Sequence, residues 1–242
     1  MPAKTRPGRP WWLFMKPRDI GLFLRSAKTD QRISEVRATD GARAAFEAAY
    51  SERDDPWESD NARYSYQRWK YEALMAALPE GRRYERVLDL GCGMGAMSLA
   101  LTKVSDDVLG LDIAEAAVAQ ARRRIGPHPG LRFEQGDLGA LDPALAGQFD
   151  LVVVADTLYY LDHLDDKSFK TAATLVAGLL APGGLCLLAN HYFFAGDKDS
   201  RLTRRIHDAF AWSPSLDLVS ARRRPFYLTS ILSRAEAVPV VR

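Results

Sequence analysis

The sequence predicts an α/β fold built on a mostly parallel sheet. Short apolar runs alternate along the chain with segments whose apolar residues recur at helical spacing. Two of these runs, Val87–Leu90 and Val108–Asp112, are almost continuously apolar, as in parallel strands that helices cover on both faces. The first run stops at three glycines within five residues, which is a strong turn signal.

The turn after the first strand has the features of a ligand loop. It contains Gly91, Gly93 and Gly95, and glycine both accepts positive φ and lets a ligand approach the main chain. Helical spacing resumes at Ala96–Leu101, so the loop precedes a helix N-terminus with free N–H groups. This pattern indicates a nucleotide-type site. The loop also fits the dinucleotide-binding pattern G-x-G-x-x-G/A, so by itself it does not exclude a dehydrogenase.

Asp89 extends the loop to D-x-G-x-G-x-G, which resembles the first motif of class I S-adenosylmethionine-dependent methyltransferases. The resemblance implies a Rossmann-like fold of seven strands ending in an antiparallel hairpin. It also implies S-adenosylmethionine as cofactor, with the glycine loop beside its amino-acid end and acidic residues holding its ribose. Asp89 and the three glycines are therefore candidate cofactor residues.

The first 40 residues are basic and rich in proline. They carry nine Lys/Arg and four Asp/Glu, which leaves 24 and 27 for the rest of the chain. Their apolar islands, Trp11–Met15 and Ile20–Leu24, show no sustained periodicity. We therefore expect residues 1–40 to be an extension, either mobile or folded over the active site as a lid, and residues 41–242 to form the methyltransferase domain. A membrane-surface anchor is a weaker alternative.

Helical spacing begins at Ala42–Tyr50 and returns over about residues 62–78. The intervening Asp55-Pro56-Trp57, the run Tyr66-Gln67-Arg68-Trp69-Lys70-Tyr71 and the later Ala76–Pro79 resemble the NodS branch, the nodulation-factor N-methyltransferases and their relatives. That branch is expected to have Glu where this chain has Gln67. The resemblance places Tyr66 and Arg68 as candidate contacts to the methionine end of the cofactor.

Two later strands supply further acids. Asp112 ends the second strand 21 residues after Gly91, where a carboxylate accepts both ribose hydroxyls. A helix follows over residues 114–124, and a third strand and turn span Leu131–Leu138. Its Asp137 matches the position in the methyltransferase family that accepts a hydrogen bond from the adenine amino group. Ile113 and Leu138, which follow these acids, complete the candidate cofactor contacts.

The fourth strand, Phe149–Val154, is apolar enough to be central. The resemblance to class I methyltransferases implies that its end faces the transferred methyl group. Asp156, Tyr159 and Tyr160 follow it directly and are candidates for orienting an acceptor, although Tyr159 also suits the core. The fifth strand, residues 185–189, is followed by His191, a candidate base. The remaining predicted elements are helices over residues 171–180 and 201–210 and strands over 216–222 and 226–232.

Composition limits the compartment and the classes of binding partner that we expect. The two cysteines, Cys92 and Cys186, provide no disulfide framework and no metal-ligand spacing, so we expect a metal-free protein in a reducing, cytoplasmic compartment. No apolar run has the roughly 20 residues of a membrane span. Arg222–Arg224 is too short to indicate a nucleic-acid footprint on a body that is near neutral. The oligomeric state is open.

These observations favour a methyltransferase that acts on a small-molecule amine, such as an amino sugar or a related biosynthetic intermediate. A small-molecule O-methyltransferase and a catalytically silent S-adenosylmethionine-binding module are the alternatives. Asp89, Asp112 and Asp137 together argue against a dinucleotide-dependent oxidoreductase.

Overall fold

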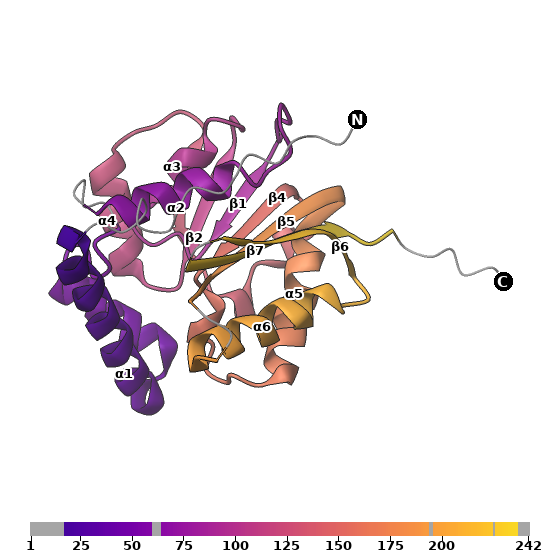
Figure 1. Ribbon diagram of the computed structural model, residues 1–242. Coiled ribbons are helices and arrows are strands. Elements are labelled where there is room, and N and C mark those ends of the chain that lie inside the picture. The colour runs from indigo at the N-terminus through magenta and orange to yellow at the C-terminus, as the bar shows by residue number, and fades with distance from the viewer. Residues whose placement is uncertain (1–16, 60–63, 194–195, 225, 237–242) are drawn as a thin grey trace.

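The fold is given by a computed structural model that describes residues 17–59, 64–193, 196–224 and 226–236 (Figure 1). The described residues form one seven-stranded sheet in the order β3-β2-β1-β4-β5-β7-β6. Strand β7 is antiparallel to both of its neighbours, and the other pairs are parallel. The predicted fold class is confirmed. The strands are β1 (Val87–Leu90), β2 (Val108–Asp112), β3 (Leu131–Gln135), β4 (Phe149–Ala155), β5 (Leu180–Tyr192), β6 (Leu216–Arg224) and β7 (Phe226–Arg234).

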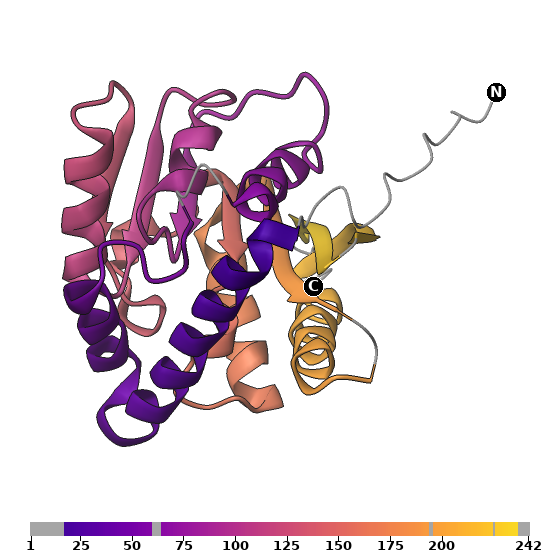
Figure 2. The ribbon, with the colours of Figure 1, turned by 60° about the vertical axis from the view of Figure 1, so that its left-hand side comes forward.

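Helices cover both faces of this sheet (Figures 1 and 2). Short 3₁₀ turns precede α1 (η2), lie in the connection from β3 to β4 (η3 and η4) and follow β4 (η5). The helices are α1 (Ile20–Glu52), α2 (Ser65–Met75), α3 (Ala96–Leu101), α4 (Glu115–Ile125), α5 (Asp166–Leu179) and α6 (Lys198–Ala211), and the 3₁₀ turns are η2 (Pro17–Asp19), η3 (Leu138–Ala140), η4 (Pro143–Leu145) and η5 (Leu158–Tyr160).

Alternation along the central strands creates two apolar cores. Leu88 and Leu90 of β1 face a core that is closed by α5 and α6. Val87, with Leu151 and Val153 of β4, faces the opposite core, which is closed by α2, α3 and α4. Because successive side chains of a strand point to opposite faces, a strand that is covered twice needs apolar residues at nearly every position. This explains why β1, β2 and β4 lack polar alternation.

Helix α1 differs most from the sequence-based expectation. It starts at Ile20, so residues 20–40 form a regular helix packed on the body, where an aperiodic extension was expected. Leu22 and Ile33 are buried against the body. Gly41 interrupts the helix with φ +83°, and the predicted domain boundary falls at this kink. The division into an extension and a domain itself stays a prediction, and Trp11–Met15 lies outside the described residues.

Smaller differences concern element ends. Strand β5 is longer than the predicted residues 185–189, and β7 continues past Ser233, where an irregular tail was expected. Among the described helices, none has the length and the apolar composition that crossing a bilayer requires.

Candidate functional site

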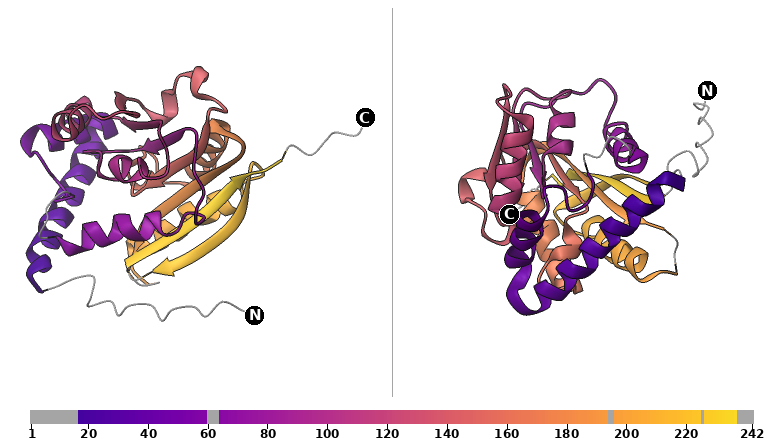
Figure 3. Two further views of the ribbon diagram at one scale, coloured as in Figure 1. Left: turned by 90° about the horizontal axis from the view of Figure 1, so that it is seen from above. Right: turned by 90° about the vertical axis from the view of Figure 1, so that its left-hand side faces the viewer.

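The candidate site is a cavity of about 390 Å³ at the carboxyl ends of β1, β2 and β4. Strands β1 and β4 are neighbours, but the chain leaves β1 toward α3 on one face and leaves β4 toward α5 on the other. Open α/β sheets bind ligands at such a reversal. Helices α1 and α2 contribute the outer walls of the cavity. In the right-hand view of Figure 3, α1 crosses in front of the sheet.

The glycine loop lies on the floor of this cavity. Gly91 and Gly93 line it and have positive φ values of +74° and +52°. A Cβ on Gly91 would lie 2.4 Å from the Thr157 hydroxyl oxygen, so the β1 and β4 loops touch only because that side chain is absent. Gly95 does not line the cavity; it adopts φ +79° just before α3. Its role is to turn the chain into the helix.

The three predicted carboxylates take different positions. Asp112 and Asp137 line the cavity, together with the predicted Ile113 and Leu138. Asp89 lies behind the loop, where its carboxylate accepts a hydrogen bond of 2.6 Å from the Ser98 hydroxyl. Burial raises the pKa of Asp89 to about 6. The structure thus assigns Asp89 a supporting contact between β1 and α3 and leaves two of the three acids facing the cavity.

Asp112 is almost fully buried and holds the loop in place. Its two oxygens accept hydrogen bonds from the backbone N–H of Gly93 at 2.9 Å and of Ala114 at 3.0 Å. Burial raises its pKa, and these N–H groups oppose that rise. Asp137 accepts a hydrogen bond from the Gly139 N–H at 2.9 Å and forms an ion pair of 3.6 Å with Arg43 of α1.

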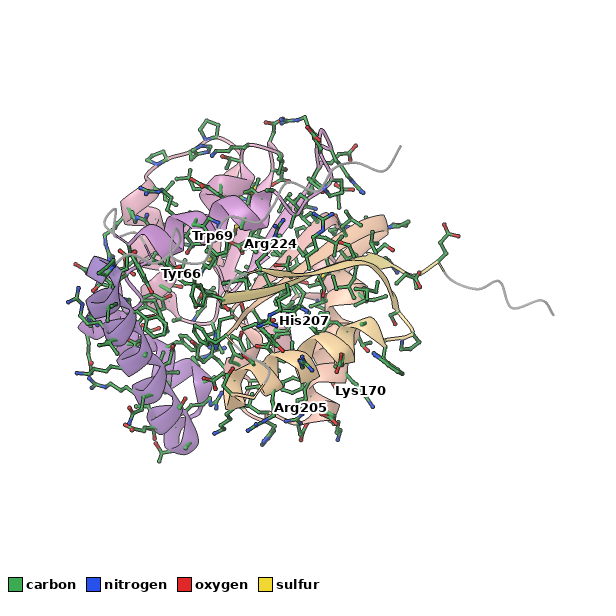
Figure 4. The ribbon with its side chains drawn as sticks, in the orientation of Figure 1. Tyr66, Trp69, Lys170, Arg205, His207 and Arg224 are labelled. Atoms are coloured by element: carbon green, nitrogen blue, oxygen red, sulfur yellow. The ribbon has the colours of Figure 1, made fainter. Side chains whose placement is uncertain are left out.

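Helix α2 presents one face to the cavity. Tyr66 lines it and points toward the start of β7, where its ring lies 6.1 Å from that of Phe226 (Figure 4). Lys70 follows Tyr66 by four residues, shares its helical face and also lines the cavity. Arg68 is two residues along, is exposed and is not among the lining residues. The cation that α2 supplies to the site is therefore Lys70, where the sequence prediction had Arg68.

Asp156 is the centre of a polar network at the end of β4. Its carboxylate lies 3.3 Å from the Lys70 ammonium and accepts hydrogen bonds from the His191 backbone N–H at 3.0 Å and from the Tyr227 hydroxyl. Burial alone would raise the pKa of Asp156, but Lys70 and His191 outweigh it and lower that pKa below its ordinary value. Asp156 has φ +53°, an uncommon backbone conformation for a non-glycine residue.

The other three predicted catalytic residues separate into two groups. Tyr160 and His191 line the cavity. Tyr159 does not; it is buried, its ring packs 4.4 Å from that of His191, and its hydroxyl lies 3.1 Å from the Thr203 hydroxyl. Burial lowers the pKa of His191, but the Asp156 carboxylate, 3.6 Å from Nδ1, raises it and prevails.

Asp30 of α1 is a lining residue that the sequence analysis missed. Its Oδ1 accepts hydrogen bonds of 2.7 Å from both the Trp57 indole N–H and the Tyr160 hydroxyl. The signal for it is the spacing of Phe23, Ala27 and Asp30, which places all three on one helical face toward the cavity. That signal is invisible until residues 20–40 are known to be helical.

The cavity-bearing core of the chain matches a known family. Residues 87–184 match the family described as "Methyltransferase domain". This segment is a methyltransferase domain. The methyltransferase domain holds the glycine loop, both cavity-lining acids of β2 and β3, and Asp156. The walls formed by α1 and α2 precede it in the chain.

Two curated relatives extend this comparison beyond the matched segment. The chain is 33% identical over 132 residues to the putative methyltransferase YqeM of Bacillus subtilis, covering 53% of this chain and 50% of that protein. It is 28% identical over 158 residues to nodulation protein S of Sinorhizobium fredii, covering 65% and 68%. The predicted resemblance to the NodS branch is confirmed. The chain spans about half the length of the first curated relatives it matches.

Solved structures agree on the fold. The N-methyltransferase NodS from Bradyrhizobium japonicum, in complex with S-adenosyl-L-homocysteine, aligns with a TM-score of 0.65 at 21% identity and covers 80% of this chain and 98% of that chain. A putative methyltransferase from Pseudomonas syringae aligns with a TM-score of 0.55 at 29% identity and covers 70% and 99%. The methyltransferase domain therefore has the predicted class I fold.

Proposed function

We propose that the protein uses S-adenosylmethionine to methylate a small-molecule amine. The observation that carries this proposal is the charge of the cavity. Among its described lining residues are six aspartates and a single Lys or Arg side chain, that of Lys70. A cleft of one sign concentrates ligands of the opposite sign, and both a sulfonium cofactor and a protonated amine are cations. The six aspartates are Asp30, Asp112, Asp137, Asp156, Asp162 and Asp199.

The residues at the domain side of the cavity fit the cofactor. Gly91 and Gly93 leave room for a ligand that a Cβ would occupy. We expect Asp112 to accept hydrogen bonds from the ribose and Asp137, which follows the neighbouring strand β3, to accept one from adenine; both line the cavity, which supports these roles. Lys70 is the cation available for the methionine carboxylate, with Tyr66 beside it. S-adenosylmethionine is the cofactor, and it supplies an electrophilic methyl group on a sulfonium.

The polar network at the end of β4 would orient the acceptor and remove its proton. Lys70 and the Tyr227 hydroxyl hold Asp156 in one position, so its carboxylate is fixed before an acceptor arrives. Holding an acceptor in a near-attack pose lowers the activation barrier by roughly 7–11 kcal/mol. His191 lines the same region, and the carboxylate of Asp156 favours its protonated form, so its imidazole is suited to take up the proton that an amine must lose.

The identity of the nucleophile is the finer part of this proposal, because the curated relatives include O-methyltransferases such as the malonyl-[acyl-carrier protein] O-methyltransferase of Enterobacter lignolyticus, 36% identical over 119 residues. The acidic cavity supports an amine over a hydroxyl, since a hydroxyl brings no positive charge. Tyr160 and His191 line the same cavity and have no proposed cofactor contact, which supports an enzyme over a silent binding module.

Compartment and partners complete the proposal. Both thiols, Cys92 and Cys186, are free and buried, which supports action in the cytoplasm. Arg223 stacks on the Tyr192 ring at 4.8 Å and donates to the Phe193 carbonyl, so one of the three consecutive arginines serves the fold. This use supports a small-molecule substrate over a nucleic acid.

The test combines binding and turnover. Calorimetry should show that the protein binds S-adenosylhomocysteine and not NAD. Incubation with S-adenosylmethionine and either glucosamine or N-acetylglucosamine should release S-adenosylhomocysteine only with the free amine, and mass spectrometry should find the added methyl on nitrogen. Binding of NAD in place of S-adenosylhomocysteine refutes the cofactor. Equal methylation of both sugars indicates a hydroxyl acceptor, and a wider amine panel without turnover refutes the proposed activity.

A further inference from the structure

The aspartates of the cavity differ in how many hydrogen bonds and ion pairs the protein itself gives their carboxylates. Asp112 bonds two backbone N–H groups, and Asp156 has Lys70, His191 and Tyr227 around it. Asp30 is different. Both of its hydrogen bonds end on Oδ1, and among the described residues no Lys or Arg forms an ion pair with it.

Two aromatic residues bond this carboxylate, and a third packs against both of them. The two donors to Asp30 are themselves ring residues, Trp57 and Tyr160, and both line the cavity. The Phe46 ring lies 4.9 Å from that of Tyr160 and 5.8 Å from that of Trp57. Phe46 also lines the cavity, so the three rings and the carboxylate are neighbours on one wall. Aromatic faces and a carboxylate together are the usual receptors of ammonium groups.

The position of Asp30 places it on the acceptor's side. It belongs to α1, which lies outside the methyltransferase domain of residues 87–184. It is close enough to Asp156 and His191 for its charge to interact with both. The cofactor loop, by contrast, packs against Tyr50 and Thr157. A ligand group at Asp30 therefore lies beside Tyr160 and the β4 network.

We propose that Asp30, enclosed by Phe46, Trp57 and Tyr160, selects the acceptor by binding its nitrogen as an ammonium ion. This inference rests on the proposed function and adds the residue that determines specificity. An amine in water near neutral pH is mostly protonated, and the carboxylate meets that form. The two hydrogen bonds from Trp57 and Tyr160 fix Oδ1, which leaves the second oxygen for the ligand.

The experiment compares two probes that differ only in charge. Choline and its uncharged isostere 3,3-dimethyl-1-butanol are titrated separately into the protein saturated with S-adenosylhomocysteine, at constant ionic strength, and tryptophan fluorescence reports binding. We expect choline to bind at least tenfold more tightly than the isostere. A ratio near one in the unmodified protein overturns the proposal without any variant.

Two variants locate the effect. Asp30→Asn keeps an oxygen that accepts from Trp57 and Tyr160 but removes the charge, so the choline preference should fall to near one. Glu35→Gln removes a carboxylate from an exposed position on the same helix and should keep the preference. An unchanged preference in Asp30→Asn refutes the proposal. Absence of amine methylation by the unmodified protein, with the choline preference intact, refutes the proposed function instead.

Discussion

Replacement of Lys70 by Met tests both the polar network and the proposed cofactor contact. The ammonium lies 3.3 Å from the Asp156 carboxylate, and the two side chains are 11% and 26% exposed. Coulomb's law at an effective dielectric constant of about 20 gives roughly 5 kcal/mol for unit charges at this separation. Removing one partner of a buried pair costs about 3–5 kcal/mol. The Tyr227 hydroxyl and His191 N–H still bond Asp156, so we expect a loss of about 2–3 kcal/mol in unfolding free energy.

Urea unfolding measures this loss, and a double variant identifies its cause. If the cost comes from leaving Asp156 without its cation, Lys70→Met combined with Asp156→Asn should regain at least half of the lost stability. A double variant that is less stable than Lys70→Met alone would refute the reasoning, because the two charges would then not be coupled.

Ligand binding separates the second role of Lys70 from the first. The proposed contact is to the methionine carboxylate, so Lys70→Met should weaken binding of S-adenosylhomocysteine by about 10- to 100-fold, or about 1.4–2.8 kcal/mol. 5′-Methylthioadenosine lacks that carboxylate and should bind the variant and the unmodified protein equally. Calorimetry measures both ligands. If the variant binds S-adenosylhomocysteine normally, or loses both ligands to the same degree, the assignment is wrong.

Three further predictions follow from the loop and the core. Asp112→Asn should weaken the binding of S-adenosylhomocysteine and of 5′-methylthioadenosine equally, by about 1–3 kcal/mol in calorimetry, because both ligands carry the ribose. Unchanged affinities would contradict the ribose assignment. Gly93→Ala should lower the free energy of unfolding in urea by about 1–2 kcal/mol more than Gly81→Ala does. Both glycines have positive φ, but only at Gly93 would the added Cβ meet a neighbour, the Tyr50 hydroxyl at 2.7 Å. Equal losses of stability in the two variants would show that this contact is not the cause. His207 lies on α6 (Figure 4) and is not a lining residue of the cavity. Burial lowers its pKa to about 3, so the unfolded chain binds the extra proton first as pH falls, and stability should drop by about 2 kcal/mol between pH 7 and pH 5. His207→Gln should show a drop smaller by that amount in urea titrations at the two pH values.

Most of the sheet was predictable because the local sequence of each strand, an apolar run that ends at turn residues, indicates the strand without its pairing partners. Val108–Asp112 has the predicted ends, since an apolar run of this length is too short for a buried helix and suits a strand that is buried on both faces. The turn at Gly91 and the reversal to α3 were likewise local. Strand β5 extends beyond its prediction because pairing with β7 continues as far as Tyr192, and pairing partners are not visible in one strand's sequence.

The site was predictable where it follows a strand and not where it comes from a helix. Asp112, Asp137 and Asp156 lie at the ends of recognised strands, and the sheet brings those ends together. Asp30 reaches the site through a bond to Tyr160, which is 130 residues away, and no local pattern encodes that distance. Lys70 was passed over for Arg68 because a two-residue change of position in a helix reverses the side it faces.

Helix α1 places the selective wall of the cavity outside the segment that carries the family match. Residues 23–30 and Trp57 all precede residue 87, where the matched segment begins. Part of the proposed acceptor wall therefore precedes the matched segment, while Tyr160 and Asp156 of the same site lie within it. A chimera that takes its first 64 residues from another member of the NodS branch should acquire the donor's acceptor while retaining this chain's affinity for the cofactor, which makes the amino-terminal stretch the natural target for redirecting the enzyme.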